Sequence, residues 1–241
     1  MTQIKPISDE TLEVLKNIPT QTLIDGLWVK GWPSGYVEGA KPLQLGQSMA
    51  GRAVTLRFVP HRPDIAEDKP KKEKSAEYLA IELCGPGEVL VIDAMGWEYS
   101  SIGGDIKFMR LMQLQVGGLV TDGGVRDSVA LKEYGFPVYS ASTTAKQGPA
   151  DFWPWQVNDA IQCGRVLVRP GDAVVGDDDG VVIVPRSEVD EVIRIAHERE
   201  KVEEVIKAQL EIENCSPGKY YPFNENTWKL YEEKTGRKKV Q

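Results

Sequence analysis

Cysteine and histidine are scarce in this chain of 241 residues. The three cysteines (Cys84, Cys163 and Cys215) lie far apart and outside any CxxC pattern, which excludes a cysteine-based zinc site. Their odd number indicates reduced thiols rather than a disulfide framework. The two histidines, His61 and His197, have no third partner in a recognisable pattern, so neither suggests a catalytic triad or a zinc site.

Long apolar runs and an excess of basic charge are also lacking. No stretch of 18 apolar residues occurs, and the first twenty residues have no apolar core of the signal-peptide type. Lys and Arg number 29 against 36 Asp and Glu, which gives a formal net charge of -7. A nucleic-acid or membrane-binding protein would be expected to carry a basic face. These absences predict a cytoplasmic protein that binds neither nucleic acid nor membrane.

Alternating strand-like and helix-like segments fill the middle of the chain. Hydrophobic residues make up 41% of the sequence and charged residues 27%, which is typical of a globular domain. We expect strands at 48–60, 88–94, 117–122, 136–142 and 164–186, and helices at 8–31, 75–83, 105–115, 128–135 and 187–213. The pattern predicts one α/β domain.

Several local details of the helices follow from residue type. Ser8 and Thr20 are expected to cap two short helices near the N-terminus, and Ser187 with Asp190 resembles a capping box. Glycine and aspartate in "GDDDG", residues 176–180, predict a tight turn rather than a calcium loop. Apolar residues recur at roughly helical spacing in the segment 105–115: Ile106, Met109, Leu111 and Met112.

The segment "GGDIKFMRLMQLQVGGLVTDGGVRDS", residues 103–128, has two ends that could carry chemistry. Its first glycine pair precedes a helix, so the backbone N–H groups of Asp105, Ile106 and Lys107 would point outward at a helix N-terminus. Such a terminus holds the oxygens of a carboxylate or phosphate well, and glycines let the ligand approach closely.

The second end follows a strand and delivers Arg126 and Asp127 just before another helix. Ligands in α/β folds gather at the carboxyl ends of strands, so the two ends are expected to be neighbours. Arg126 would offer a planar fork for a carboxylate or a developing oxyanion. Asp127 and Asp105 would offer oxygen ligands for a hard cation such as Mg²⁺. The alternative is that the glycine pairs are ordinary turns and that Asp127 only caps a helix.

The spacing from Asp105 to Arg126-Asp127, set within "VGGLVTDGGVRDS", resembles the signature of the RraA-like family. Further segments agree in order: "IPTQTLIDGL" with Asp25, "GRAVTL", "GPGEVLVIDA" and "RPGDAVVGDDDGVVIVPRSEVDEVI". The family includes metal-dependent (class II) pyruvate aldolases that act on 4-hydroxy-4-methyl-2-oxoglutarate and 4-carboxy-4-hydroxy-2-oxoadipate. It also includes RraA itself, a non-enzymatic regulator that binds and inhibits an RNA-degrading endonuclease.

The resemblance implies a role for each residue of the motif. Asp127 would be the protein ligand of Mg²⁺ or Mn²⁺, and Arg126 would contact the keto oxygen of the substrate. Backbone N–H groups across Gly104, Asp105, Ile106 and Lys107 would hold the pyruvyl carboxylate. Asp105 would also orient or deprotonate the water that takes the substrate's hydroxyl proton. Lys107 departs from the small or apolar residue often found there.

The fold implied by the resemblance is a compact β/β/α sandwich of the swivelling-domain type, with helical N- and C-terminal extensions. Residues 1–210 would form the single domain, and residues 211–241 would form an arm that packs on it or contacts another subunit. A homotrimer or homohexamer is implied, with sites between subunits, and Glu200 or Glu203 is a candidate for the acidic residue that a neighbour contributes. An ordinary solvated helix face explains these two glutamates equally well.

The activity implied is retro-aldol cleavage of a 4-hydroxy-2-oxo acid to pyruvate. The same enolate forms when oxaloacetate loses CO₂, so decarboxylation is an expected side activity. The rival hypothesis is the regulator, because a regulator can keep a relict site. Trp153 and Trp155 are typical of a core or a subunit interface, although one of the tryptophans could instead shape a substrate pocket.

Overall fold

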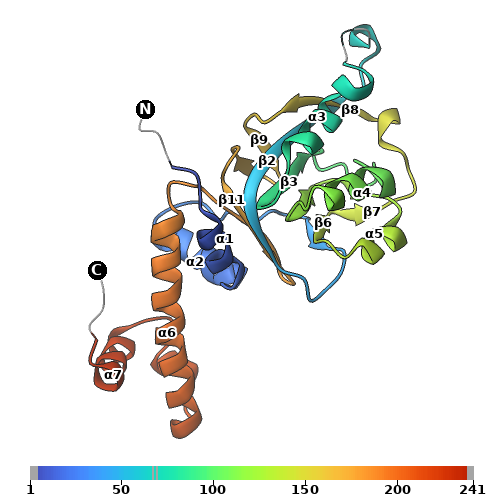
Figure 1. The fold of residues 1–241 in the computed structure, drawn as a ribbon. Coiled ribbons are helices and arrows are strands. Elements are labelled where there is room, and N and C mark those ends of the chain that lie inside the picture. Colours follow the sequence, from blue (N-terminus) through green and yellow to red (C-terminus); the bar gives the residue numbers. More distant parts are fainter. Residues whose placement is uncertain (1–4, 67, 69, 238–241) are drawn as a thin grey trace.

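A strongly bent mixed sheet forms the centre of the computed structural model, which describes residues 5–66, 68 and 70–237 (Figure 1). Its strands follow the order β1-β6-β4-β3-β2-β11-β12, and β8 pairs with the far part of β2. The strands β2, β3, β4 and β6 run parallel, whereas β11 and β12 form an antiparallel hairpin. Their bounds are β1 (Lys41–Pro42), β2 (Met49–Pro60), β3 (Glu88–Asp93), β4 (Gly118–Thr121), β6 (Val138–Ser140), β8 (Phe152–Val157), β11 (Ala173–Asp177) and β12 (Gly180–Val184).

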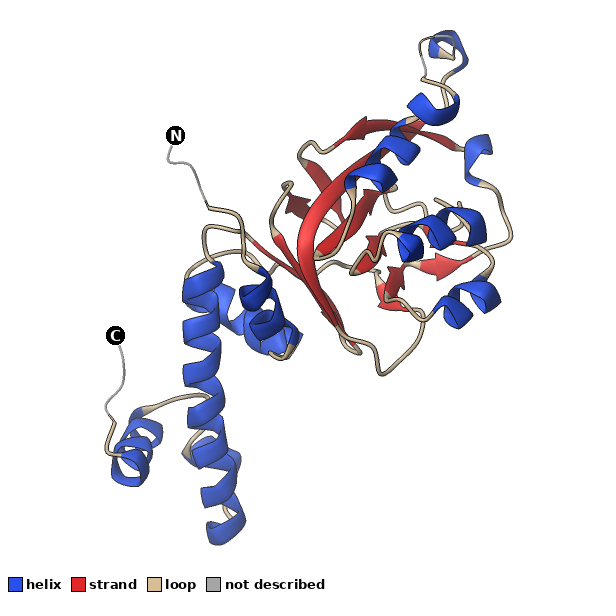
Figure 2. Ribbon diagram, in the orientation of Figure 1, coloured by secondary structure: helices blue, strands red, loops and turns tan. Residues whose placement is uncertain are grey.

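Helices lie on two sides of this sheet (Figure 2). Their bounds are α1 (Asp9–Lys16), α2 (Thr20–Val29), α3 (Ala76–Leu83), α4 (Asp105–Gln113), α5 (Ser128–Tyr134), α6 (Val189–Glu213) and α7 (Glu225–Thr235). The short strands β5 (Gly124–Val125) and β7 (Ser142–Thr143) pair with each other, as do β9 (Ile161–Cys163) and β10 (Val166–Val168). The described residues also form four single turns of 3-10 helix: η1 (Pro63–Ile65), η2 (Lys72–Lys74), η3 (Gly148–Ala150) and η4 (Pro217–Lys219).

The strand β3 explains the layering, because its apolar side chains alternate between two cores. Leu90 and Ile92 lie in the cluster with α3, α4 and α5. Val89 and Val91 lie in the cluster that includes β9 and β10 on the other face. Successive strand residues point to opposite faces, so a strand covered on both sides must be apolar throughout. The α/β domain predicted from the sequence pattern and the β/β/α sandwich implied by the family resemblance are therefore confirmed.

The helical extensions form a third core on the outer side of the β11–β12 hairpin. Side chains of α1, α2 and the first half of α6 pack there against Val175 and Val182, among others. Beyond this contact α6 continues past the sheet, and α7 folds back on it through Val202, Ile206 and Leu230 (Figure 1). The expected boundary at residue 210 falls inside α6, and contact of this arm with another subunit stays a prediction. Among the described residues, no helix is long and apolar enough to cross a membrane.

Two of the expected caps are wrong, and one is confirmed. Ser8 caps α1 by accepting a hydrogen bond from the Thr11 N–H at 3.2 Å. Thr20 is instead the first residue of α2, and its hydroxyl and N–H both donate to Asp177, each at 2.9 Å. At α6 the cap is Glu188, which follows the proline-containing turn after β12 and makes no side-chain cap bond. Thr20 thus binds Asp177 at the end of β11 instead of capping α2.

The apolar face expected for α4 is also rotated. Phe108 and Leu111 face the core, whereas Ile106 is 77% exposed and Met109 is 41% exposed. The helix packs on β3 and β4 through Phe108 and Leu111, which lie three residues apart. Phe108 was not among the residues from which the apolar face was predicted. Ile106 therefore lies on the exposed side of α4, beside the candidate site, rather than in the core.

A carboxylate at the corner between α6 and η4 predicts how the arm responds to acid. Glu213 accepts hydrogen bonds from Lys219 at 2.6 Å, Gln209 at 2.8 Å and Tyr220 at 2.9 Å. Lys219, followed by Gln209 and Tyr220, lowers the pKa of the Glu213 carboxyl from 4.5 to about 2. A lowered pKa in the folded state stabilises the fold above the unfolded value, and this contribution is lost as the pH falls.

We therefore expect Glu213→Gln to reduce the urea midpoint at pH 6, and the difference from the parent protein to shrink between pH 4.5 and pH 2. Urea titrations at four pH values measure this. Glu211→Gln, an exposed neighbour on the same helix, is the matched control. A difference that does not change with pH would contradict the assignment.

Candidate functional site

The two glycine-flanked ends of residues 103–128 meet in the folded chain. The Asp105 N–H donates to Asp127 Oδ2 at 3.1 Å, and the Arg126 N–H donates to the Gly103 carbonyl at 3.1 Å. The α4 helix, the β4 strand and the turn at Gly123 close the gap between them. The structure thus brings together Asp105, Arg126 and Asp127, as the sequence predicts.

The backbone of Asp127 has a left-handed conformation, with φ 60° and ψ 38°. Such a conformation is uncommon outside glycine and gathers at functional sites, where the surroundings hold it in place. Asp127 occupies the cap position of α5, yet its side chain makes no cap bond there. The simple helix-cap interpretation is therefore wrong, because the carboxylate turns toward the N-terminus of α4 instead.

Gly104 allows this close approach. A Cβ atom at this position would lie 2.1 Å from Asp127 Oδ2 and 2.8 Å from Arg126 Cγ. Both distances are far below van der Waals contact, and the backbone there carries the cap of α4. Glycine is the residue that lets the Arg126–Asp127 pair rest on the helix N-terminus.

The backbone N–H groups expected to bind a carboxylate already have acceptors within the chain. The Asp105 N–H donates to Asp127, the Ile106 N–H donates to Asp105 Oδ1 at 2.7 Å, and the Lys107 N–H donates to the Gly104 carbonyl at 3.1 Å. Two of these three acceptors are carboxylate oxygens, as expected for a helix N-terminus. A ligand carboxylate at this N-terminus would have to replace Asp127 Oδ2 or Asp105 Oδ1 as an acceptor.

Arg126 and Asp127 face two adjacent hollows. One, of about 310 Å³, is bounded by residues 103–107 and 147–149. The other, of about 710 Å³, is bounded by the start of α5 and residues 143–145. The Arg126 side chain is 45% exposed, and its Nε lies 3.6 Å from Asp127 Oδ2. Its charge is thus available to a ligand in either hollow.

The donor set fits a largely hydrated divalent cation. Asp127 Oδ1 has no hydrogen-bond partner among the described residues, so it can serve as a ligand. Nowhere in residues 5–66, 68 and 70–237 do three or more His, Cys, Asp or Glu side chains gather as a metal site. Mg²⁺ and Mn²⁺ are held by one or two carboxylates with water in the remaining positions, whereas structural zinc needs four protein ligands.

Lys107 is turned away from this pair. Its ammonium forms an ion pair with Glu77 of α3 at 2.5 Å and donates to the Ile102 carbonyl at 3.3 Å. Only its backbone N–H belongs to the N-terminus of α4. The departure of this residue from the pattern therefore affects the neighbouring surface near α3 rather than the Arg126–Asp127 pair.

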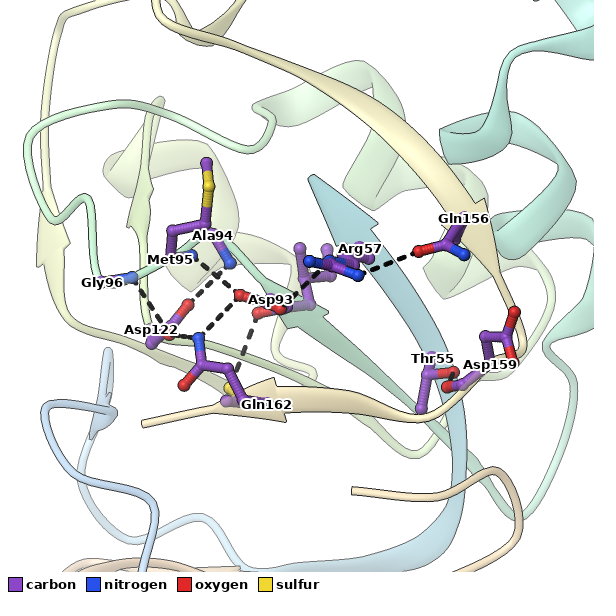
Figure 3. Close-up of polar contacts among 12 residues, drawn as sticks. Thr55, Arg57, Asp93, Ala94, Met95, Gly96, Asp122, Gln156, Asp159 and Gln162 are labelled. Atoms are coloured by element: carbon purple, nitrogen blue, oxygen red, sulfur yellow. Dashed lines mark hydrogen bonds and ion pairs between the residues drawn. The ribbon is translucent and has the colours of Figure 1, made fainter. Parts of the chain in front are cut away.

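A second polar cluster, which the sequence interpretation missed, lies at the carboxyl ends of β3 and β4 (Figure 3). Asp122 accepts from the N–H groups of Ala94 at 2.7 Å, Gly96 at 3.1 Å and Gly164 at 3.2 Å. The Gln162 amide links Asp122 and Asp93, at 2.9 and 2.7 Å. Asp122 thus ties the strand that leads to Arg126 to two neighbouring turns. The sequence contained one signal for this cluster, which is an aspartate at the end of each of two neighbouring strands.

Asp93 differs from Asp122 in how its oxygens are used. Its Oδ1 accepts from the Met95 N–H and Gln162, while its Oδ2 lies 3.9 Å from Arg57 Nε (Figure 3). Burial of the side chain raises the pKa of the Asp93 carboxyl. A raised pKa costs stability once the pH exceeds it, so an uncharged isostere is tolerated there.

We expect Asp122→Asn to lower the free energy of unfolding by about 2–3 kcal/mol, because one amide N–H must then face a backbone donor. Asp93→Asn should change it by less than about 1 kcal/mol, since its carbonyl can keep both donors, and the amide meets only Arg57, which is 3.9 Å away, half exposed and able to turn to solvent. Urea unfolding of the two isosteric variants at pH 7 measures the difference. Equal losses would show that Asp122 does not organise this edge.

The remaining acidic candidates lie elsewhere. Glu200 is paired with His197 at 3.3 Å, and neither Glu200 nor Glu203 lines a hollow beside Arg126. Both are on α6, on the other side of the sheet from α4 and α5 (Figure 1). Asp25 accepts from Arg199 at 2.7 Å and thereby fastens α2 to α6. A role for Glu200 or Glu203 in another subunit's site stays a prediction.

A bent β/β/α sandwich with an Arg-Asp pair on a helix N-terminus defines the class of protein. The chain belongs to the RraA-like family, since the family model described as Aldolase/RraA matches residues 20–183.

The relatives of this chain include proteins with aldolase names. A protein from Halalkalibacterium halodurans named "Putative 4-hydroxy-4-methyl-2-oxoglutarate aldolase" is 32% identical over 193 residues, which cover 78% of this chain and 83% of the relative. A protein of Methanocaldococcus jannaschii with no assigned activity, MJ0644, is 26% identical over 86% of this chain and 92% of its own.

Solved structures agree on the fold. The Streptomyces coelicolor protein RraAS2, described as an unusual member of the RNase ES inhibitor RraA protein family, superposes with a TM-score of 0.77. It is 31% identical and covers 85% of this chain and all of its own. A Pseudomonas syringae protein with a TM-score of 0.74 is 22% identical, covers 89% and 98% of the two chains, and supports the fold alone.

Proposed function

We propose that this protein is a divalent-metal-dependent lyase that cleaves the C3–C4 bond of a 4-hydroxy-2-oxo acid and releases pyruvate. The contact of Asp127 with the Asp105 N–H carries the proposal, because it brings a carboxylate, a guanidinium and a helix N-terminus together beside one hollow. The aldolase names of several relatives support the same activity.

Each part of the site has a task in this reaction. The N-terminus of α4 binds the carboxylate of the pyruvyl half, which replaces one of the two carboxylate oxygens that now accept from its N–H groups. Arg126 donates to the keto oxygen and stabilises the negative charge that develops there as the bond breaks. A divalent cation held by Asp127 would supply Lewis-acid stabilisation of the same charge.

The proposed role of Asp105 is to assist transfer of the C4 hydroxyl proton. Its carboxylate is partly exposed at the mouth of the hollow, beside Arg126 and Asp127. A carboxylate there can orient the water that takes the proton from the C4 hydroxyl. The proton later returns to C3 and gives pyruvate. Decarboxylation of oxaloacetate would use the same residues, since it passes through the same enolate.

A coupled pyruvate assay tests the proposal. Purified protein is mixed with 4-hydroxy-4-methyl-2-oxoglutarate and with oxaloacetate, each with Mg²⁺ and with EDTA. We expect pyruvate release from both with Mg²⁺ and a fall to the solution background with EDTA. Release that is equally fast in EDTA, or absent with a wide panel of 4-hydroxy-2-oxo acids and oxaloacetate, would reject the lyase.

The regulator remains the second candidate, favoured by the likeness to RraAS2. A regulator would inhibit an RNA-degrading endonuclease of the RNase E type without needing Arg126 or Asp127. An RNA-cleavage assay with and without this protein distinguishes the two functions. Inhibition that survives Asp127→Ala, together with no pyruvate release, would establish the regulator instead.

A further inference from the structure

A third hollow, of about 300 Å³, adjoins the candidate site and has no part in the chemistry described so far. It shares Ser101, Lys107 and Pro149 with the hollow that contains Arg126 and Asp127. Its other walls come from α3, the end of β2, the start of β8 and residues 70–72. Its volume lies at the lower end of the range for small-molecule sites.

The floor of this hollow is aromatic and tightly packed. Phe58 and Phe152 meet edge to face with ring centroids 4.7 Å apart, and Trp153 packs in the same manner on His61 at 4.5 Å. Phe58, Phe152 and Trp153 are 3%, 1% and 6% exposed, so their rings are fixed by the core beneath them. Tyr78 of α3 adds a fourth ring that is 41% exposed.

Positive charge lies at one side of the mouth. Lys72 is an exposed residue of the lining, and the charge of Lys107 is balanced there by Glu77. The hollow therefore combines an aromatic, apolar floor with a lysine at its rim. This combination fits a group that is flat and apolar along its length and anionic at its far end.

Resting on the function proposed above, we infer that this hollow receives the substituent on C4 of the substrate, and that this substituent is an aryl-like group bearing an anion. Position is the first reason, because the hollow shares Ser101, Lys107 and Pro149 with the hollow assigned to the pyruvyl half and therefore adjoins it. Composition is the second, because a methyl substituent would leave most of 300 Å³ without contacts.

The chemistry of the step is unchanged by this assignment. The C3–C4 bond breaks, its electron pair stays on C3, and the C4 hydroxyl proton passes to a water. C4 leaves as the carbonyl carbon of an aldehyde that carries the aryl group. C3 takes up one proton, and the products are pyruvate and the aryl aldehyde, with no oxidant or reductant needed.

Three substrates test the inference: 4-hydroxy-2-oxopentanoate, 4-hydroxy-2-oxo-4-phenylbutanoate and its 4-carboxyphenyl analogue. We expect kcat/KM to rise in that order. Tyr78→Ala should reduce the preference for the phenyl over the methyl substrate by about tenfold. Lys72→Gln should reduce the preference for the carboxyphenyl over the phenyl substrate by about threefold to tenfold.

The matched control substitutions lie within one helical turn of the two tested residues, Tyr78 and Lys72. Leu79→Ala changes an exposed side chain of α3 outside the hollow, and Lys74→Gln removes an exposed charge from η2 outside it. Neither should alter either preference. If the methyl substrate is cleaved as well as the others, or if the test variants shift preference no more than these controls, the inference is wrong.

Failure of the underlying function has a different signature. The unsubstituted oxaloacetate reaction of the unmodified protein depends on the pyruvyl half alone. If that reaction and all three cleavages are absent with Mg²⁺, the proposed function fails and the inference fails with it. If oxaloacetate is decarboxylated but the preferences do not respond to Tyr78→Ala and Lys72→Gln, only the inference fails.

Discussion

Replacing Asp127 with alanine is expected to lower kcat/KM for pyruvate release from a 4-hydroxy-2-oxo acid by about 10³-fold. The proposed role of the carboxylate is to hold the cation, which would contribute several kcal/mol of charge stabilisation in the transition state. The side chain is 35% exposed, and its carboxylate contacts the Asp105 N–H and Arg126 rather than the core, so the fold should be retained. The coupled pyruvate assay with Mg²⁺ measures the effect.

Asp190→Ala is the matched control, because it removes an exposed carboxylate from the first turn of α6. It should leave kcat/KM within about twofold, as surface substitutions generally have small effects. Circular dichroism of both variants checks that the fold is unchanged. Retention of more than a tenth of the activity in Asp127→Ala would remove this residue from the metal site.

The second large effect is expected from Gly104→Ala. The added methyl group would meet Asp127 Oδ2 and Arg126 Cγ at 2.1 and 2.8 Å, so both side chains must move. Displacement of reacting groups by about 1 Å can cost about 10²-fold in rate, and here two groups move together. We expect kcat/KM to fall by at least about 10²-fold, with Mg²⁺ activation shifted to higher concentration.

Gly103→Ala provides a near-identical substitution one residue earlier. Its methyl group would meet Lys107 Cδ at 3.1 Å and Phe108 Cε2 at 3.4 Å, which are milder contacts than those at Gly104 and require smaller shifts. A loss of about tenfold or less is expected, measured in the same assay. Equal losses in Gly103→Ala and Gly104→Ala would mean that the close approach to Asp127 is not what the glycine permits.

Much of the fold follows from the sequence because its patterns are local. The apolar run of β3 and the glycine that ends α5 at Gly135 are direct consequences of burial and of left-handed backbone. The Asp105 to Asp127 spacing predicted that two strand-to-helix junctions would be neighbours, and the hydrogen bond between them agrees.

Other features depended on tertiary contacts that no local pattern contains. Thr20 gave up its expected role as a cap because Asp177, more than 150 residues away, accepts its hydroxyl. The ion pair of Lys107 with Glu77 needs α3 and α4 side by side, so its direction was not predictable from either helix. In the sequence, Asp122 is an ordinary residue at the end of a strand. Only the folded chain brings four hydrogen-bond donors to its carboxylate.

The left-handed backbone of Asp127 was the most informative feature that the sequence concealed. An aspartate before a serine at a helix start suggests a cap, and the residue types alone favoured that interpretation. Only the backbone angles and the contact with Asp105 turn its carboxylate toward Arg126. The site therefore rests on conformation as much as on composition.

Binding of Mn²⁺ in the presence of oxalate, an analogue of the pyruvate enolate, tests the central claim without knowledge of the full substrate. Titration of the protein, followed by the electron paramagnetic resonance of free Mn²⁺, gives the number of ions bound and their affinity. We predict one Mn²⁺ per chain, with affinity at least about tenfold weaker in Asp127→Asn. Equal Mn²⁺ binding by the parent protein and Asp127→Asn would contradict the account.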